Sequence, residues 1–228
     1  MGGFSINVEI NPLDLFGLKE NGYKLYVFKA VKTSCEGAAC VGSVFGPEFL
    51  LTQTQINCEE EVHAYISDDV VEENKVIYPR QRISLKSGNS IQIDSSGHFQ
   101  ATQTGRGHGI HVQSKTNASY TIGLAQKIWT IEKNVAPSIL FATSLTGVGK
   151  SCTMTTTDKV LLIFSTENYD SGTPLHKTIS TGAFIDMSGF AHRAVSFNLE
   201  NGWQAHGADW LKVIPAFRNL KDLLLEHA

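Results

Sequence analysis

Short apolar runs bounded by turn-forming residues recur along the chain and predict β-strands. Each run is rich in β-branched or aromatic residues, and Gly, Asn, Asp or Ser stands at its ends. Plentiful Gly, Ser and Thr favour short strands joined by many turns. Apart from the repeated blocks described next, the segments expected to form strands are residues 4–10, 40–45, 49–55, 82–85, 109–113, 138–143, 152–157 and 193–199.

Three blocks recur in the same order in the two halves of the chain, at similar spacings. In the first block, a Tyr is followed by apolar residues at matching positions, such as Leu25 and Val27 in one copy and Ile122 and Leu124 in the other. An ordered set of matches is hard to obtain by chance, so the sequence predicts an internal duplication. The matching segments are residues 22–31 with 119–128, 61–67 with 159–165, and 93–99 with 185–190.

The predicted fold is all-β: a duplicated β-sandwich of two pseudo-twofold related halves, with a short C-terminal α-helix. Each half alone would leave one face of its sheet in water, and packing against its twin buries that face. The expected division is a first β half-domain at residues 1–104, a linker at 105–118, a second β half-domain at 119–207, and a helix at 208–228 that packs on the sheets.

The C-terminal segment changes to a helical pattern. Pro215 fits the first turn of a helix, where its missing N–H costs nothing. Phe217, Leu220, Leu223 and Leu224 then fall on one face. The favoured interpretation is that this face caps an open end of the sheets. Docking on a partner is the alternative. Docking on a membrane is poorly supported, because the segment carries few basic residues.

Charge and hydropathy exclude several classes of partner. The chain of 228 residues has a formal charge of −3 and no cluster of Lys and Arg, which argues against nucleic-acid binding. No apolar stretch is long enough to span a bilayer. The first residues lack the pattern of a secretory signal, so the expected compartment is the cytoplasm.

Four cysteines are present, at positions 35, 40, 58 and 152. Cys35 and Cys40 are close enough in sequence to form a disulfide in an oxidising compartment, whereas free thiols are expected in a reducing cytosol. The spacing of the cysteines does not match a zinc-binding pattern, and we expect neither a metal site nor a bound cofactor.

Residues 144–151 resemble the phosphate-binding loop of P-loop nucleotidases in their last three residues, Gly149, Lys150 and Ser151. Ser144 replaces the first glycine of that motif. A phosphate loop must also open a helix, whereas the residues that follow favour a strand. We therefore expect a hairpin here and not a nucleotide site.

The glycine-rich segment at residues 105–111 could approach a ligand closely. Arg106 could bind an anion, and His108 could transfer protons near neutral pH. His108 and His111 would point to opposite faces of a strand, so they are not expected to share a metal. A flexible connection between the halves is the favoured interpretation of this segment.

The tryptophans are the candidate ligand-binding residues, because aromatic rings beside polar side chains form flat apolar sites. Trp203 and Trp210 flank His206 and Asp209 in the sequence, and Trp129 follows the second copy of the first block. The competing interpretation, which we favour, is that these rings plug the end of the sandwich.

Three hypotheses of function follow. The first is a small-molecule or glycan-binding β protein without a cofactor. The second is a cofactor-independent enzyme of the isomerase or cyclase type, with an apolar pocket between the halves and Arg106, His108, His206 and Asp209 as acid–base and anchoring candidates. The third is a self-associating structural protein in which the C-terminal helix forms a homodimer. No nucleophile with its base occurs in a recognisable motif.

Overall fold

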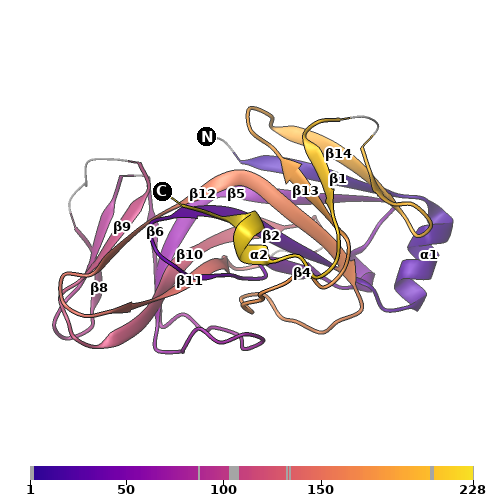
Figure 1. Cartoon of the computed structure of the whole chain (residues 1–228). Helices are drawn as coiled ribbons and strands as arrows, with labels where there is room; N and C mark the ends of the chain where they lie inside the picture. Colours follow the sequence, from indigo (N-terminus) through magenta and orange to yellow (C-terminus); the bar gives the residue numbers. More distant parts are fainter. Residues whose placement is uncertain are drawn as a thin grey trace.

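The computed structural model shows an elongated molecule built from two β-sheets, which confirms the predicted all-β fold (Figure 1). Helix α1 (Pro12–Glu20) lies at one end of the molecule, and strands β8 (Phe99–Thr102) and β9 (Ile110–Ser114) lie at the other. The residues that the structure describes are 3–86, 88–102, 108–131, 133, 135–205 and 208–227.

The two sheets are both mixed, with mainly antiparallel pairs. Sheet A runs in the order β15 (Gly202–Gln204), β14 (His192–Asn198), β1 (Phe4–Ile10), β5 (Gln53–Ser67), β10 (Ser119–Trp129), β11 (Ser138–Thr146) and β3 (Ala38–Ala39), with β6 (Gln81–Leu85) also paired to β5. Sheet B runs in the order β16 (Leu211–Ile214), β13 (Gly182–Asp186), β12 (Ser151–Ser165), β9, β7 (Ser90–Ile93) and β8. In sheet B, β2 (Lys24–Thr33) pairs with β12, β4 (Ser43–Phe45) and β17 (Leu225–His227).

The pattern of apolar and polar residues located most strands. The predicted strand at residues 4–10 is β1, and that at 82–85 is β6. The predictions at 40–45 and 49–55 both began too early. In the second of these, Pro47 opens a short 3₁₀ helix, η1 (Pro47–Phe49), and β5 begins only at Gln53.

Helix α1 was not predicted from the sequence. The side chain of Asn11 accepts a hydrogen bond from the Asp14 amide, and Pro12 occupies the first turn, so the helix has a regular N-terminal cap. Its apolar residues do not form a buried stripe, because Leu13 is 85% exposed and Phe16 is 66% exposed. The periodicity that reveals most helices is therefore missing.

The C-terminal helix is much shorter than predicted. Helix α2 spans only Leu220–Leu224, between β16 and β17, with Asn219 as its N-cap. Pro215 precedes the helix, and Phe217 is 76% exposed with a positive φ of 63°. The Phe217 amide donates to the Thr178 carbonyl, which holds this segment in a turn. The predicted apolar face is thus correct for Leu220 and Leu224, which are buried, and wrong for Phe217.

The strand ladders of the two halves of the chain have matching registers. We call two residues counterparts when they occupy the same place in the two sets of ladders. Taken in chain order, strands from the first half correspond to strands from the second, with the same parallel or antiparallel pairings. The corresponding strands are β1 and β9, β2 and β10, β4 and β11, β5 and β12, β6 and β13, β7 and β14, and β8 and β15.

The agreement extends to individual residues and to an irregularity. In the β2–β12 ladder Leu25 faces Phe164, and in the β10–β5 ladder its counterpart Ile122 faces Ile66. Residues 157–159 of β12 bulge opposite a single residue, Ala30. In the other ladder, residues 59–61 of β5 bulge in the same place opposite Lys127.

The third repeated block requires a correction. Ile185 of β13 faces Val160 of β12, and the residue in the corresponding place is Leu85 of β6, which faces Val62 of β5. Ile185 is therefore not the counterpart of Ile93, as the sequence match suggested. Similar Asp-containing turns follow Ile93 and Ile185, and these turns produced the false match.

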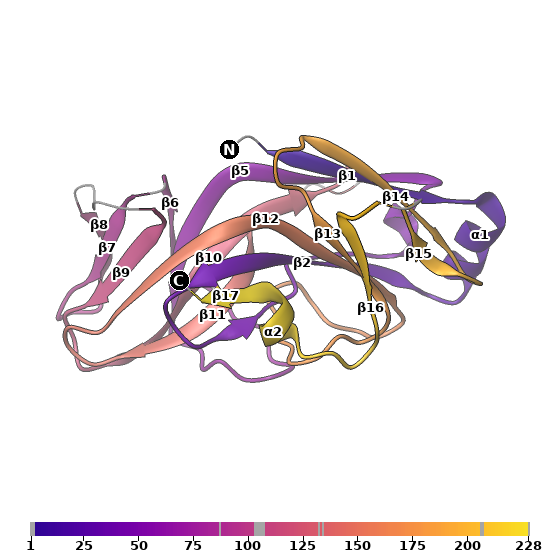
Figure 2. The ribbon, with the colours of Figure 1, turned by 45° about the horizontal axis from the view of Figure 1, so that its top comes forward.

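Strands of both predicted half-domains are exchanged between the sheets. β2 pairs with β12 from the second half, and β10 pairs with β5 from the first. β1 likewise pairs in parallel with β14. Residues 110–114, which fall in the predicted linker, form β9 and pair with β7 and β12, so this part of the linker is a strand and not a flexible connection. Figure 2 shows the long curved strands β5 and β12 running along the molecule and carrying these partners. Each sheet thus contains strands from both halves.

A buried polar contact joins the two sheets at the middle of the molecule. Lys29 of β2 and Gln126 of β10 are counterparts, facing Val160 and Val62 respectively. The Lys29 Nζ donates to the Gln126 Oε1 at 2.7 Å, and Lys29 is only 4% exposed. Burial lowers the pKa of Lys29, and the ammonium also lies 4.8 Å from the centre of the Phe4 ring. This charged hydrogen bond therefore links the two sheets within the core.

We expect Gln126→Leu to lower the free energy of unfolding by about 1–3 kcal/mol, because it removes the acceptor from a buried ammonium group. Urea denaturation monitored by circular dichroism would measure this. The double variant Lys29→Met/Gln126→Leu replaces the whole pair by apolar groups and should be more stable than Gln126→Leu alone. The interpretation would be contradicted if the double variant lost as much free energy of unfolding as the two single variants lose together.

Stability should also depend on pH through Lys29. Its pKa is lowered in the folded protein, whereas the unfolded chain keeps its proton up to the ordinary value of 10.5. Between these two pKa values the unfolded state binds more protons, so the free energy of unfolding rises with pH. The free energy of unfolding, measured by denaturation at several pH values in this range, should rise with pH in the wild type and should lack this rise in Lys29→Met. Parallel pH profiles for the two proteins would refute the assignment.

Candidate ligand-binding face

The outer face of sheet A carries a row of polar side chains near the α1 end. On β1, Ile6 and Val8 point into the core, so Asn7 and Glu9 point outward. On β5, the same alternation brings polar residues to the outside. We call the following set the outer polar face: Ser5, Asn7 and Glu9 of β1, and Gln53, Gln55 and Asn57 of β5.

The register of β1 and β5 places these side chains side by side. Asn7 faces Gln55, and Glu9 faces Gln53. The Asn7 amide donates to the Glu9 carboxylate at 3.3 Å, and the Gln55 amide donates to the Asn57 Oδ1 at 3.1 Å. Each amide group has two donors and one acceptor, so these contacts use only part of its hydrogen-bonding capacity. Gln53 and Gln55 are both exposed to solvent.

Two shallow clefts open on this face and share Gln53. The first cleft has a volume of about 250 Å³, below the usual range of small-molecule sites, and the second, of about 370 Å³, lies near the lower end of that range. The first cleft has an apolar rim. Asn7, Phe49, Leu51, Gln53, Thr54, Gln55, Thr130 and Ile131 line the first cleft. Glu9, Ile10, Asn11, Thr52, Gln53, Ser196, Phe197 and Asn198 line the second.

Trp129 is the candidate tryptophan that borders the outer polar face. It ends β10 opposite Asn57, whose amide donates to the Trp129 carbonyl at 3.5 Å. The ring is half-buried, and the Lys127 ammonium lies 5.7 Å from its centre. Its Nε1 is buried and has no hydrogen-bond partner among the described residues.

The other two tryptophans lie in different surroundings. Trp203 is 3% exposed, stacks on Phe164 with ring centres 5.2 Å apart, and donates from Nε1 to the Thr181 carbonyl. Trp210 is half-buried beside the Arg193 guanidinium, 4.4 Å from the ring centre. Trp203 therefore fills the inside of the sandwich, as the plugging interpretation described.

The candidate acid–base residues are only partly described. Arg106 and His206 lie outside the described residues. His108 is exposed just before β9, and Asp209 is exposed just before β16. Strands β13 and β12 separate β16 from β9 in sheet B, so the structure does not bring His108 and Asp209 together (Figure 2).

The segment that resembles a phosphate loop forms a turn between two strands. Gly147 and Gly149 both have positive φ, and β12 begins directly afterwards at Ser151. The expected hairpin is wrong, because β11 belongs to sheet A and β12 to sheet B, and the two strands do not pair. The turn instead carries the chain from one sheet to the other, and a strand follows it, as expected, in place of the helix of a phosphate loop.

Sequence reasoning passed over the residues of the outer polar face. The signal was available, because residues 4–10 alternate apolar with polar side chains, and an amide stands at every second position of residues 53–57. Such alternation is also the ordinary pattern of a solvated sheet face. Only the pairing of β1 with β5, and the loops beside them, distinguish this face from any other.

The counterparts of these residues form a polar face on the other end of the molecule. His111 is the counterpart of Asn7, and Thr153 is that of Gln55. The His111 Nδ1 lies 3.1 Å from the Thr153 Oγ1, so these side chains bond to one another. This second face offers matched control positions for any test of the first.

Among the described residues, no group of three or more His, Cys, Asp or Glu side chains is arranged to hold a metal ion. No helix within the described ranges has the length and apolar character needed to cross a membrane. Comparisons of the chain with known protein families, with curated proteins and with solved structures found no match.

Trp203→Ala should lower the free energy of unfolding by about 3–5 kcal/mol, because it leaves a large cavity beside Phe164 and Phe197. Phe16→Ala, at an exposed ring, is the control and should change it by no more than about 0.5 kcal/mol. Urea denaturation of both variants would measure the difference. A Trp203→Ala protein with wild-type stability would show that this ring does not support the core.

Proposed function

We propose that this protein binds a glycan, or another small polyhydroxylated molecule, on the outer polar face, without a cofactor. The observation that carries the proposal is the row of exposed amide and carboxylate groups beside an apolar rim. Asn7, Glu9, Gln53 and Gln55 stand at adjacent ladder positions and line the two clefts. All the interactions would come from side chains of the chain itself.

The chemistry of the face suits a sugar. Adjacent sugar hydroxyls both donate and accept hydrogen bonds, and planar amide and carboxylate groups supply partners of both kinds. A sugar ring also has an apolar face that needs an apolar surface to pack on. Leu51 and Ile131 are exposed at the rim of the first cleft, and the Trp129 ring borders the same face.

We further propose that the chain arose by duplication of a unit of about half its length. The matching registers of the paired strands support this, including the bulge at residues 59–61 and 157–159. Duplication would have produced two polar faces. The loops of the first half, at residues 11–23 and 46–52, are longer than the corresponding loops at 115–118 and 147–150. The longer loops then supplied the rim of the clefts at one end only.

The two other hypotheses have less support. An enzyme of the proposed type would need its acid–base groups together, whereas His108 and Asp209 precede strands that lie apart in sheet B. A homodimer formed through the C-terminal helix would need an available apolar face. Leu220 and Leu224 are instead buried, and α2 packs on β2 and β3 of its own chain.

A glycan array probed with the full chain, followed by calorimetry on the strongest ligand, tests the proposal. Gln55→Ala and Asn7→Ala should each weaken binding about tenfold or more, because each removes a hydrogen bond worth about 1.5 kcal/mol. The counterpart variants Thr153→Ala and His111→Ala should leave affinity unchanged. An array without ligands, or equal losses in both pairs of variants, would refute the proposed site.

A further inference from the structure

Two cysteines that are distant in the sequence come together where β2 meets the start of β12. Thr33 faces Met154 in the ladder, and the alignment continues past the end of β2. The Ser34 amide donates to the Thr153 carbonyl at 3.0 Å, and the Thr153 amide donates to the Ser34 Oγ at 2.9 Å. Cys35 and Cys152 are the next residues along these two segments, just past the end of the ladder, and the Cys35 amide donates to the Thr33 Oγ1 at 3.1 Å.

The geometry of this position suits a disulfide. Disulfides join residues whose Cα atoms are about 4.4–6.8 Å apart, a range that includes opposed residues of neighbouring antiparallel segments. The Cys35 thiol is near enough to Cys152 to contribute, after burial, to the raised pKa of the Cys152 thiol. The Cys35 Sγ also lies 3.5 Å from the Ser151 carbonyl oxygen, and the Cys152 Sγ lies 3.5 Å from the Thr33 Oγ1. Both sulfur atoms therefore lie between the same two strand segments.

Cys40, the partner that sequence spacing suggested for Cys35, lies elsewhere. It is fully buried in a small separate cluster with Tyr65 and Ile139. Its Sγ contacts the Ala38 carbonyl at 3.8 Å. Cys35 instead packs against the main core that contains Cys152. The fold thus brings the half-buried thiol of Cys35 to Cys152 and not to Cys40.

We propose that Cys35 and Cys152 are a redox-modification site that closes to an intramolecular disulfide when the protein meets a small disulfide oxidant. The oxidant first exchanges with the accessible Cys35 thiol, which forms a mixed disulfide and releases one small thiol. The Cys152 thiolate then attacks the Cys35 sulfur and releases the second small thiol. Two protein thiols are oxidised, and one disulfide is reduced to two thiols.

The two cysteines differ in a way that orders these steps. Cys152 is fully buried, and burial together with the Cys35 thiol raises its pKa to about 12. The thiolate is the nucleophile, and burial still disfavours it in the mixed disulfide, so the closing step should become faster as the pH rises above neutrality. Cys35 is half-buried and is the side chain that a dissolved reagent can reach.

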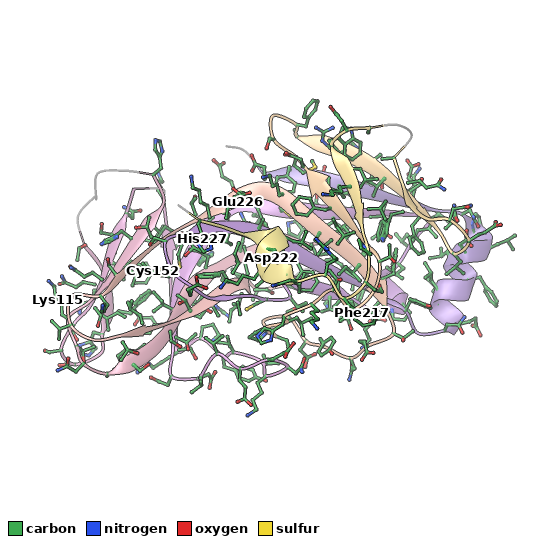
Figure 3. The ribbon with its side chains drawn as sticks, viewed as in Figure 1. Lys115, Cys152, Phe217, Asp222, Glu226 and His227 are labelled. Atoms are coloured by element: carbon green, nitrogen blue, oxygen red, sulfur yellow. The ribbon has the colours of Figure 1, made fainter. Side chains whose placement is uncertain are left out.

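Closure would fix the end of β2 in place. Near this point β2 pairs with the C-terminal strand β17 on one side, where Thr33 lies beside His227, and with β12 on the other. Cys152 in turn faces Val112 of β9. Figure 3 shows Cys152 and His227 on the part of the molecule that carries β9 and the C-terminus. The disulfide would join the end of β2 covalently to the start of β12, beside their ladder partners β17 and β9.

The test treats the full chain with oxidised glutathione at several pH values. Mass spectrometry should show loss of two hydrogens, and peptide mapping should identify a Cys35–Cys152 link. The oxidised protein should melt on the order of 10 °C higher than the reduced protein, because the bond closes a long loop in the unfolded chain. Dithiothreitol should restore the original mass and melting temperature.

Variants make the test specific. Cys35→Ser and Cys152→Ala should each abolish the link, and Cys152→Ala should keep the glutathione adduct on Cys35. Cys40→Ala is the matched control and should form the link as the wild type does. A persistent glutathione adduct in the wild type, a link that needs Cys40, or no oxidation at all would each overturn the proposal.

Discussion

Each of the long strands β5 and β12 pairs with two different strands along one of its edges. β5 pairs first with β1 and then with β6, and β12 pairs first with β9 and then with β13. In both, a bulge of three residues separates the two sets, at residues 59–61 and 157–159. A bulge bends a strand and increases its local twist, so these two irregularities determine how the ends of the molecule splay from its middle. The contact between Lys29 and Gln126 lies beside them.

The two ends that result are alike in their strands and different in their loops. Strands β1 and β14 at one end repeat the parallel pair of β9 and β7 at the other, and Trp203 occupies the place of Phe99. Helix α1 and η1 have no counterparts in the shorter loops of the second half. The two ends therefore share their strands and differ chemically in the longer loops of the first half. Binding residues in proteins concentrate on such loops.

Much of the fold could be read from the sequence, because strands such as β1 show a clean alternation that only one structure explains. Helix α1 could not, since exposed Leu13 and Phe16 give it no apolar stripe. The exchange of β2 and β10 between the halves could not be read either. Alternation tells which face of a strand is buried, and says nothing about which distant strand lies beside it. For the same reason the sequence named Trp203 as a site candidate and passed over Gln55.

The exchange of strands has a consequence for how the chain can acquire its structure. β2 finds its main partner only when residues 154–165 of β12 have been synthesised, long after β2 itself. Contacts so far apart in sequence are slow to form, and unpaired edges remain open while they wait. In an incomplete chain, the edge of β2 that pairs with β12 would therefore be unpaired and could pair with another molecule. The strands of the first half complete their ladders only when the second half is present.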